Sequence, residues 1–147
     1  MIQRIQTIFL LLAAACAFCL FAFPFGTTAS PVSASSIYSD GVYNIQDSPA
    51  LLALFCIAGG LAFISIFLFN NRKTQMLLAR IAIVANLIGL VMVIVFYYNN
   101  ALALQDVNDE ENIIGFSLPI AFLVFAILAL RFIKKDENLV SSMDRLR

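Results

Sequence analysis

The stretch LLARIAIVANLIGLVMVIVFYY, residues 77–98, decides the fold class of this chain. A helix rises about 1.5 Å per residue, so a helix of this length crosses a hydrocarbon core of about 30 Å. Its one charged residue, Arg80, lies a turn inside the start, where the side chain can reach the lipid headgroups. Small and polar residues recur at helical spacing and form one narrow face: Ala79, Ala82, Asn86 and Gly89. We expect this face to pack inward and the branched residues between them to contact lipid.

Three other stretches are similarly apolar: residues 5–25, 49–69 and 113–133. The chain of 147 residues is 62% hydrophobic, whereas soluble domains are about half apolar. We therefore predict a single all-α membrane domain, residues 1–147, built as an integral membrane bundle of four transmembrane helices. The remaining segments are predicted to form two outer loops, an inner loop and a tail: residues 26–48, 99–112, 70–76 and 134–147.

The charges predict the orientation of this bundle. All nine Lys and Arg residues lie beside the same ends of the four stretches: Arg4, Arg72, Lys73, Arg80, Arg131, Lys134, Lys135, Arg145 and Arg147. Six of the nine acids lie in the connections on the other side: Asp40, Asp47, Asp106, Asp109, Glu110 and Glu111. Cytoplasmic segments collect Lys and Arg because their translocation is opposed. We therefore predict cytoplasmic termini in a multi-pass protein of the cell inner membrane.

The first stretch has two alternative interpretations. Val32-Ser33-Ala34 resembles a cleavage site, which would make the stretch a signal peptide, and Ala15-Cys16 would suit a lipoprotein signal. However, residues 5–25 exceed the about 7 to 15 apolar residues of a signal peptide, and Cys16 is followed by further apolar chain. We predict a retained helix with Pro24 in its last turn.

The longer outer loop begins with small polar residues and ends with an Asp40-Gly41 pair. Residues 37–43 are therefore interpreted as a turn or a small hairpin. All four tyrosines are predicted at the outer headgroup level: Tyr38, Tyr43, Tyr97 and Tyr98. The second helix is predicted to start at Ser48 and Pro49, since Pro is tolerated at the first helical position. Its middle carries a patch of small residues: Ala58, Gly59, Gly60 and Ala62.

Residues suited to chemistry are scarce. The chain has no His, and no Asp, Glu, Lys or Arg lies near the centre of any apolar stretch, where proton relays and ion-coupled carriers need such a residue. Cys16 and Cys19 form a C-x-x-C, but an apolar setting disfavours the reactive thiolate, so we interpret both as packing residues. We predict no catalytic, cofactor-binding or metal-binding residue, no nucleic-acid binding and no enzymatic activity; an enzyme acting on lipid has the least support.

Two polar features each allow two interpretations. Asp109-Glu110-Glu111 has the oxygen ligands for a divalent cation, yet acids at a helix start also complement the helix dipole, with Asn108 or Asp109 as the cap. We favour capping. Asn86 would either line a solute path or form a hydrogen bond between helices, and we favour the hydrogen bond.

The predicted tail, residues 134–147, has an amphipathic pattern. Four apolar residues fall on one helical face: Leu139, Val140, Met143 and Leu146. Glu137, Ser141 and Asp144 fall opposite. This pattern favours a short helix lying on the membrane, with Lys134 and Lys135 near anionic headgroups.

The two ends of the chain resemble a known family. The opening MIQRIQTIFLLL, residues 1–12, and the closing KDENLVSSMDRLR, residues 135–147, are similar to the ends of small four-helix membrane proteins of Bacteroidetes. That family is known only as a domain of unknown function. The resemblance implies an inner-membrane protein with cytoplasmic ends and a retained first helix, and it implies no activity.

These observations predict a small non-enzymatic membrane protein, a scaffold or accessory subunit of an inner-membrane assembly. Its docking surfaces would be the Arg4 segment and Asp144-Arg145-Leu146-Arg147, with self-association through the small-residue faces and the tail. The alternative is a small-solute channel or transporter that acts as an oligomer, with Asn86, Gly59 and Gly60 lining the path. Beyond such protein contacts, the predicted partner is the lipid bilayer.

Overall fold

Four helices dominate the computed structural model, and the predicted all-α class is confirmed. The structure describes residues 2–27, 41–69, 71–101 and 109–144, and side chains within 5–27, 41–69, 71–99 and 113–140. The helices are α1 (Ile2–Cys19), α2 (Pro49–Phe67), α3 (Arg72–Ala101) and α4 (Asp109–Asp144). A short antiparallel pair, β1 (Gly26–Thr27) and β2 (Val42–Tyr43), and a 3-10 helix, η1 (Ile45–Asp47), lie between α1 and α2.

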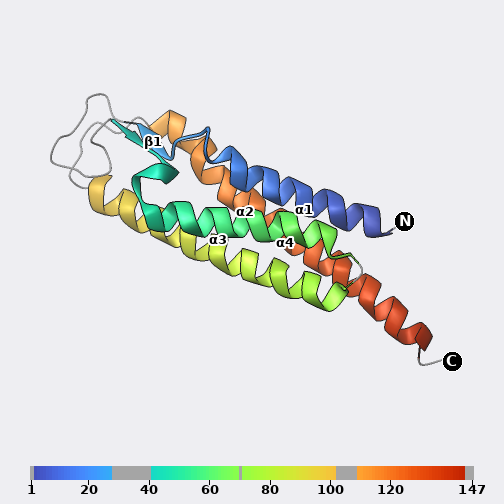
Figure 1. Cartoon of the computed structure of the whole chain (residues 1–147). Helices are drawn as coiled ribbons and strands as arrows, with labels where there is room; N and C mark the ends of the chain where they lie inside the picture. Colours follow the sequence, from blue (N-terminus) through green and yellow to red (C-terminus); the bar gives the residue numbers. More distant parts are fainter. Residues whose placement is uncertain (1, 28–40, 70, 102–108, 145–147) are drawn as a thin grey trace.

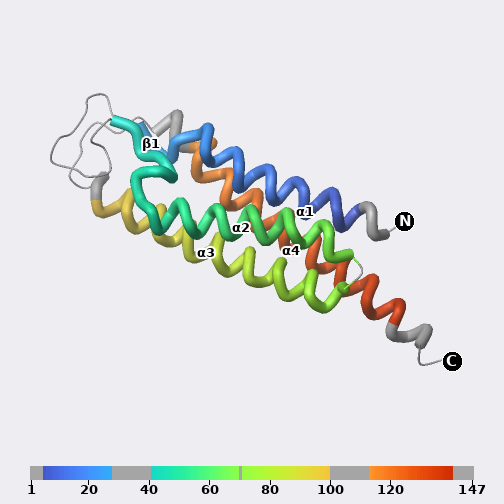
Figure 2. The backbone as a smooth tube through the Cα atoms, in the orientation of Figure 1, coloured from blue at the N-terminus to red at the C-terminus, as the bar shows by residue number. Residues whose placement is uncertain are grey.

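The helices form an up-down-up-down bundle (Figure 1). Each of α1 and α3 packs against both α2 and α4, so neighbouring helices run in opposite directions. The short connection between α2 and α3, residues 68–71, is typical of antiparallel neighbours, whereas residues 20–48 separate α1 from α2. Both ends of the chain consequently lie at one end of the bundle, called here the terminal end, and the β1–β2 pair lies at the other, the loop end (Figure 2).

Helix α1 is shorter than the predicted range 5–25. It ends at Cys19, and residues 20–23 turn through hydrogen bonds from Phe21 N to Phe18 O (3.2 Å) and from Ala22 N to Cys19 O (2.9 Å). Pro24 has no N–H and disfavours helical geometry in the residue before it, so the helix stops ahead of it.

Helix α3 begins earlier than the predicted residue 77. Asn71 Oδ1 accepts a hydrogen bond from the backbone N–H of Thr74 (3.3 Å), which is an N-cap contact. Most of the predicted inner connection 70–76 therefore belongs to the first turns of α3. Helix α2 starts at Pro49 with Ser48 at the N-cap position, as predicted, although the Ser48 side chain makes no capping hydrogen bond.

Helix α4 has 36 residues, which at about 1.5 Å each is about 54 Å. The predicted tail is, as far as Asp144, a continuation of this helix that extends past the other three (Figure 1). It does not fold back as a separate helix, contrary to our expectation of a short helix lying on the membrane. A helix of this length exceeds even the about 40–45 Å of a bilayer with its headgroups.

Alanines form the middle of the bundle. The central buried cluster comprises Ala13, Ala14, Ala17, Ala58, Ala62, Ala82, Ala85, Phe122 and Ala126. Small side chains let helix backbones approach closely, which is the main source of contact between helices in lipid. The predicted inward face of α3 is confirmed, because Ala79, Ala82, Asn86 and Gly89 are all buried while Val84 and Leu87 are exposed.

Three described helices, Pro49–Phe67, Arg72–Asn99 and Ile113–Val140, are long and apolar enough to cross a membrane. The apolar part of α1, Ile5–Cys19, is shorter. The outward faces of the bundle carry the apolar side chains that such a setting requires, including Phe63, Val91 and Val124.

Candidate functional site

The polar contacts between helices are the first place to look for a site. Asn86 on α3 is fully buried, and its Nδ2 donates a hydrogen bond of 3.0 Å to the backbone carbonyl oxygen of Pro119 on α4. The favoured interpretation of Asn86 is therefore confirmed. Pro119 lies inside α4, and its missing N–H disturbs the regular helix hydrogen bonds around it.

The residues predicted to line a solute path are not brought together. Asn86 lies in the α3–α4 contact, while a Cβ on Gly59 would be 3.0 Å from Ala17 Cβ of α1. Gly60 has no described atom within 4 Å of the position where a Cβ would be. Within the described residues of one chain, Asn86, Gly59 and Gly60 therefore do not share a surface.

The loop end is closed by an aromatic cluster that the sequence did not predict. Phe25 is at its centre, with ring centroids 5.3 Å from Tyr43, 6.2 Å from Phe55 and 5.9 Å from Phe116. Tyr97 contacts Phe116 edge-on at 5.3 Å. These five residues, called here the aromatic cap, come from the β1–β2 pair and its flank and from three helices.

The aromatic cap corrects two predictions. Tyr43 is 0% exposed and packs inside the cap, so it does not meet the headgroups as expected; Tyr98, at 64% exposed, has the predicted outward position. Val42 and Tyr43 pair with Thr27 and Gly26, so the described strand contact is not a local hairpin across Asp40-Gly41. Tyr38 and residues 37–40 lie outside the described residues.

Gly115 permits the contact that holds the cap against α4. A Cβ at this position would overlap the carbonyl oxygen of Pro24 and lie 2.8 Å from the Cα of Phe25. The backbone after α1 thus crosses α4 at the one residue type that leaves room for it. This role of Gly115 was not predicted from the sequence, although the residue lies near the start of the predicted span 113–133.

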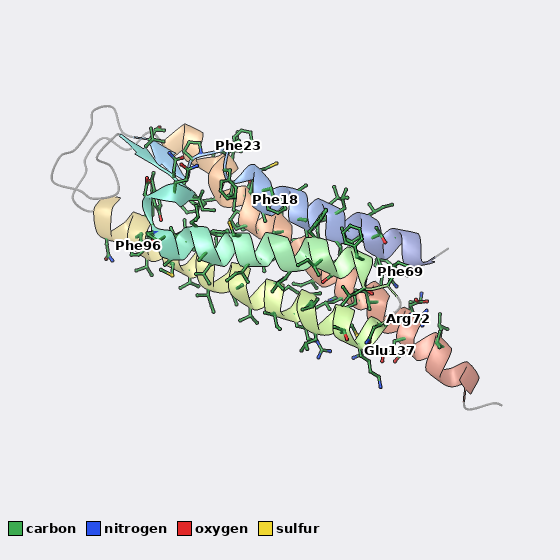
Figure 3. The ribbon with its side chains drawn as sticks, in the orientation of Figure 1. Phe18, Phe23, Phe69, Arg72, Phe96 and Glu137 are labelled. Carbon is green, nitrogen blue, oxygen red and sulfur yellow. The ribbon has the colours of Figure 1, made fainter. Side chains whose placement is uncertain are left out.

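The terminal end is joined by polar contacts to the backbone and side chains of α4. Gln6 Nε2 of α1 donates a hydrogen bond of 3.1 Å to the carbonyl of Phe132, and Arg72 of α3 forms an ion pair of 3.2 Å with Asp136. Figure 3 labels Arg72 near the point where α4 leaves the bundle. The base of the extended part of α4 is therefore attached to two other helices.

The remaining candidates show no assembled chemistry in the described part of the chain. Helix α4 begins at Asp109, as a capping role requires, but the side chains of Asp109, Glu110 and Glu111 and all of Asn108 lie outside the described residues. No group of three or more potential metal ligands occurs within the described residues. Cys16 packs at the edge of the alanine cluster, whereas Cys19 is exposed and both are free thiols.

The fold and the apolar outer surface are typical of an all-α, multi-pass membrane protein. The chain matches the family model described as "Domain of unknown function (DUF4293)" over residues 2–146, and it belongs to that family. No curated protein and no solved structure matches it.

Proposed function

We propose that this protein is a non-enzymatic scaffold or accessory subunit of an inner-membrane assembly, and that the end of α4 docks its protein partner. The observation that carries the proposal is the unbroken helix from Asp109 to Asp144, whose end extends past the other three helices (Figure 1). An isolated short helix is marginal in water. Because the extension continues a packed helix, its direction is fixed and no new helix has to be nucleated.

The attachment of this extension supports a docking role. The Arg72–Asp136 ion pair lies at its base, and both side chains are largely shielded from solvent. Beyond it, Leu139 and Val140 are exposed apolar side chains on a helix otherwise rich in charge. Such residues on a rigid helix suit recognition by a groove in a partner protein.

We further propose that α1 is a fourth span, with both termini in the cytoplasm. The distribution of Lys and Arg supports this orientation. The turn at residues 20–23 and the strand β1 continue α1 toward the loop end, where Phe21 and Phe23 are exposed apolar side chains. Together they extend the apolar length of the short helix toward that of its neighbours.

Removal of residues 139–147 tests the docking role. This deletion removes Leu139 and Val140 and leaves the Arg72–Asp136 pair in place. A second variant replaces the same nine residues with Gly and Ser to keep the length. After mild crosslinking in native membranes, we expect both variants to lose partners that co-purify with the unaltered protein. An unchanged set of partners in both variants would refute the proposal.

A further inference from the structure

A cationic stripe on α4 lies on the side of the helix that faces away from the bundle. Arg131, Lys134, Lys135 and Asn138 are all exposed and, with Leu139, line a surface hollow of about 390 Å³. Successive helix residues are about 100° apart, so the first four fall within a sector of about 100°. Ile133, which is 0% exposed in the core, lies about 160° around the helix from Arg131.

The described acids of this part of α4 lie outside the sector of the stripe. Asp136 points toward α3, where it pairs with Arg72 at 3.2 Å. Asp136 and Glu137 lie about 140° and 120° around the helix from Arg131, on either side of the stripe. The cationic stripe therefore carries three positive charges and an amide within one sector of about 100° of the helix. Guanidinium and ammonium groups in this arrangement suit the oxygens of a phosphate.

The same face of α4 is apolar toward the middle of the bundle. Ile120, Val124 and Ile127 are exposed and lie within about 40° of Arg131 around the helix. From Ile120 to Arg131 the helix rises about 16 Å, close to one leaflet of a hydrocarbon core about 30 Å thick. A phosphate site that continues into an apolar strip one leaflet long is complementary in length and polarity to a phospholipid.

We infer that the cationic stripe and the Ile120–Val124–Ile127 strip bind one anionic phospholipid, with its phosphate among Arg131, Lys134 and Lys135 and an acyl chain along α4. Basic surfaces beside membrane helices recognise anionic headgroups in this way. The inference is independent of the proposed docking role, because it concerns the lipid-facing side of α4 and needs no protein partner.

Native mass spectrometry of the purified full-length protein in detergent tests this inference, with phosphatidylglycerol and phosphatidylcholine as probes. We expect one phosphatidylglycerol to bind in preference to phosphatidylcholine. The double variant Lys134→Gln/Lys135→Gln should weaken phosphatidylglycerol binding about 30-fold, since each cation near a membrane surface contributes about fivefold. Lys134→Arg/Lys135→Arg should retain binding, because it keeps both charges.

The matched control is Lys73→Gln/Arg80→Gln, which removes two exposed cations from α3 at the same end of the bundle. We expect it to keep phosphatidylglycerol binding within about twofold of the unaltered protein. Equal losses in the two double variants would overturn the inference and leave only a general charge effect. Displacement of the lipid by millimolar glycerol phosphate, or equal binding of both lipids, would also overturn it. Since no partner is present, these results are separate from the fate of the docking proposal.

Discussion

Asn86 Nδ2 and the carbonyl oxygen of Pro119 are joined by a buried hydrogen bond of 3.0 Å, 33 residues apart in the chain. The bond ties the middle of α3 to α4 beside an otherwise alanine-lined core. The Asn86 Oδ1 atom is also buried and has no hydrogen-bond partner among the described residues. Asn86 therefore connects the two helices through its amide nitrogen alone.

Replacement of Asn86 by Ala should lower the stability of the folded bundle by about 1 kcal/mol, since interhelical hydrogen bonds in membranes are worth about 0.6 kcal/mol on average and up to about 1.7. The buried site also loses side-chain contacts. Unfolding of the purified protein in mixed micelles measures the change. Val84→Ala, at an exposed position of the same helix, is the control and should change stability by less. Equal effects would mean that the hydrogen bond contributes nothing.

Gly115→Ala should destabilise the bundle by about 1–3 kcal/mol, the usual range for an overpacked site. The added methyl would meet the Pro24 carbonyl and the Phe25 Cα, both of them backbone atoms that cannot simply rotate away. Gly60→Ala supplies the control, because nothing lies within 4 Å of its Cβ position. That variant should be neutral or gain up to about 1 kcal/mol from helix propensity. A Gly115→Ala protein as stable as Gly60→Ala would contradict the close crossing.

Phe25→Ala should lower the free energy of unfolding by about 3–5 kcal/mol, as is typical of a buried Phe. The Phe25 ring is 0% exposed at the centre of the aromatic cap. Phe23, two residues earlier, is 41% exposed and is labelled in Figure 3; its replacement by Ala is the control. Thermal unfolding monitored by near-ultraviolet circular dichroism should show a large decrease in stability for Phe25→Ala and a small decrease for Phe23→Ala. Similar losses would show that the cap does not hold the loop end.

The Arg72–Asp136 pair should show a positive coupling energy in a double-mutant cycle of Arg72→Gln and Asp136→Asn. Both partners are partly shielded, with side-chain exposures of 23% and 13%. We therefore expect a value near the upper part of the about 0.2–1 kcal/mol found for exposed pairs. The stability of the four proteins at low and high salt gives the coupling. A coupling of zero at low salt would show that the pair does not brace α4.

The four-span arrangement predicts the positions of reporters. Fusions after Ser36 and Asn108 should report the outside, and a fusion after Arg147 the cytoplasm, as the distribution of Lys and Arg requires. A tag placed before Met1 should be protected or exposed together with the reporter after Arg147. If the two termini reported opposite sides, α1 would not be a span.

The sequence by itself determined the helices and the inward face of α3. Long apolar stretches leave the backbone no partner but its own helix, so residues 49–69, 77–98 and 113–133 could be assigned without any tertiary contact. The spacing of Ala79, Ala82, Asn86 and Gly89 is a local property of one helix, and it predicted burial correctly.

Only the tertiary structure decided what joins the helices. Pro24 ends α1 locally, but the fold brings the Pro24–Phe25 backbone against Gly115 of α4. Tyr43 is buried because Phe25, from the segment after α1, packs against its ring. The Arg72–Asp136 pair and the direction of the α4 extension also depend on neighbours remote in the chain. The spacing of small and apolar residues along a helix indicates which of its faces is buried. It does not indicate which residue of another helix lies opposite.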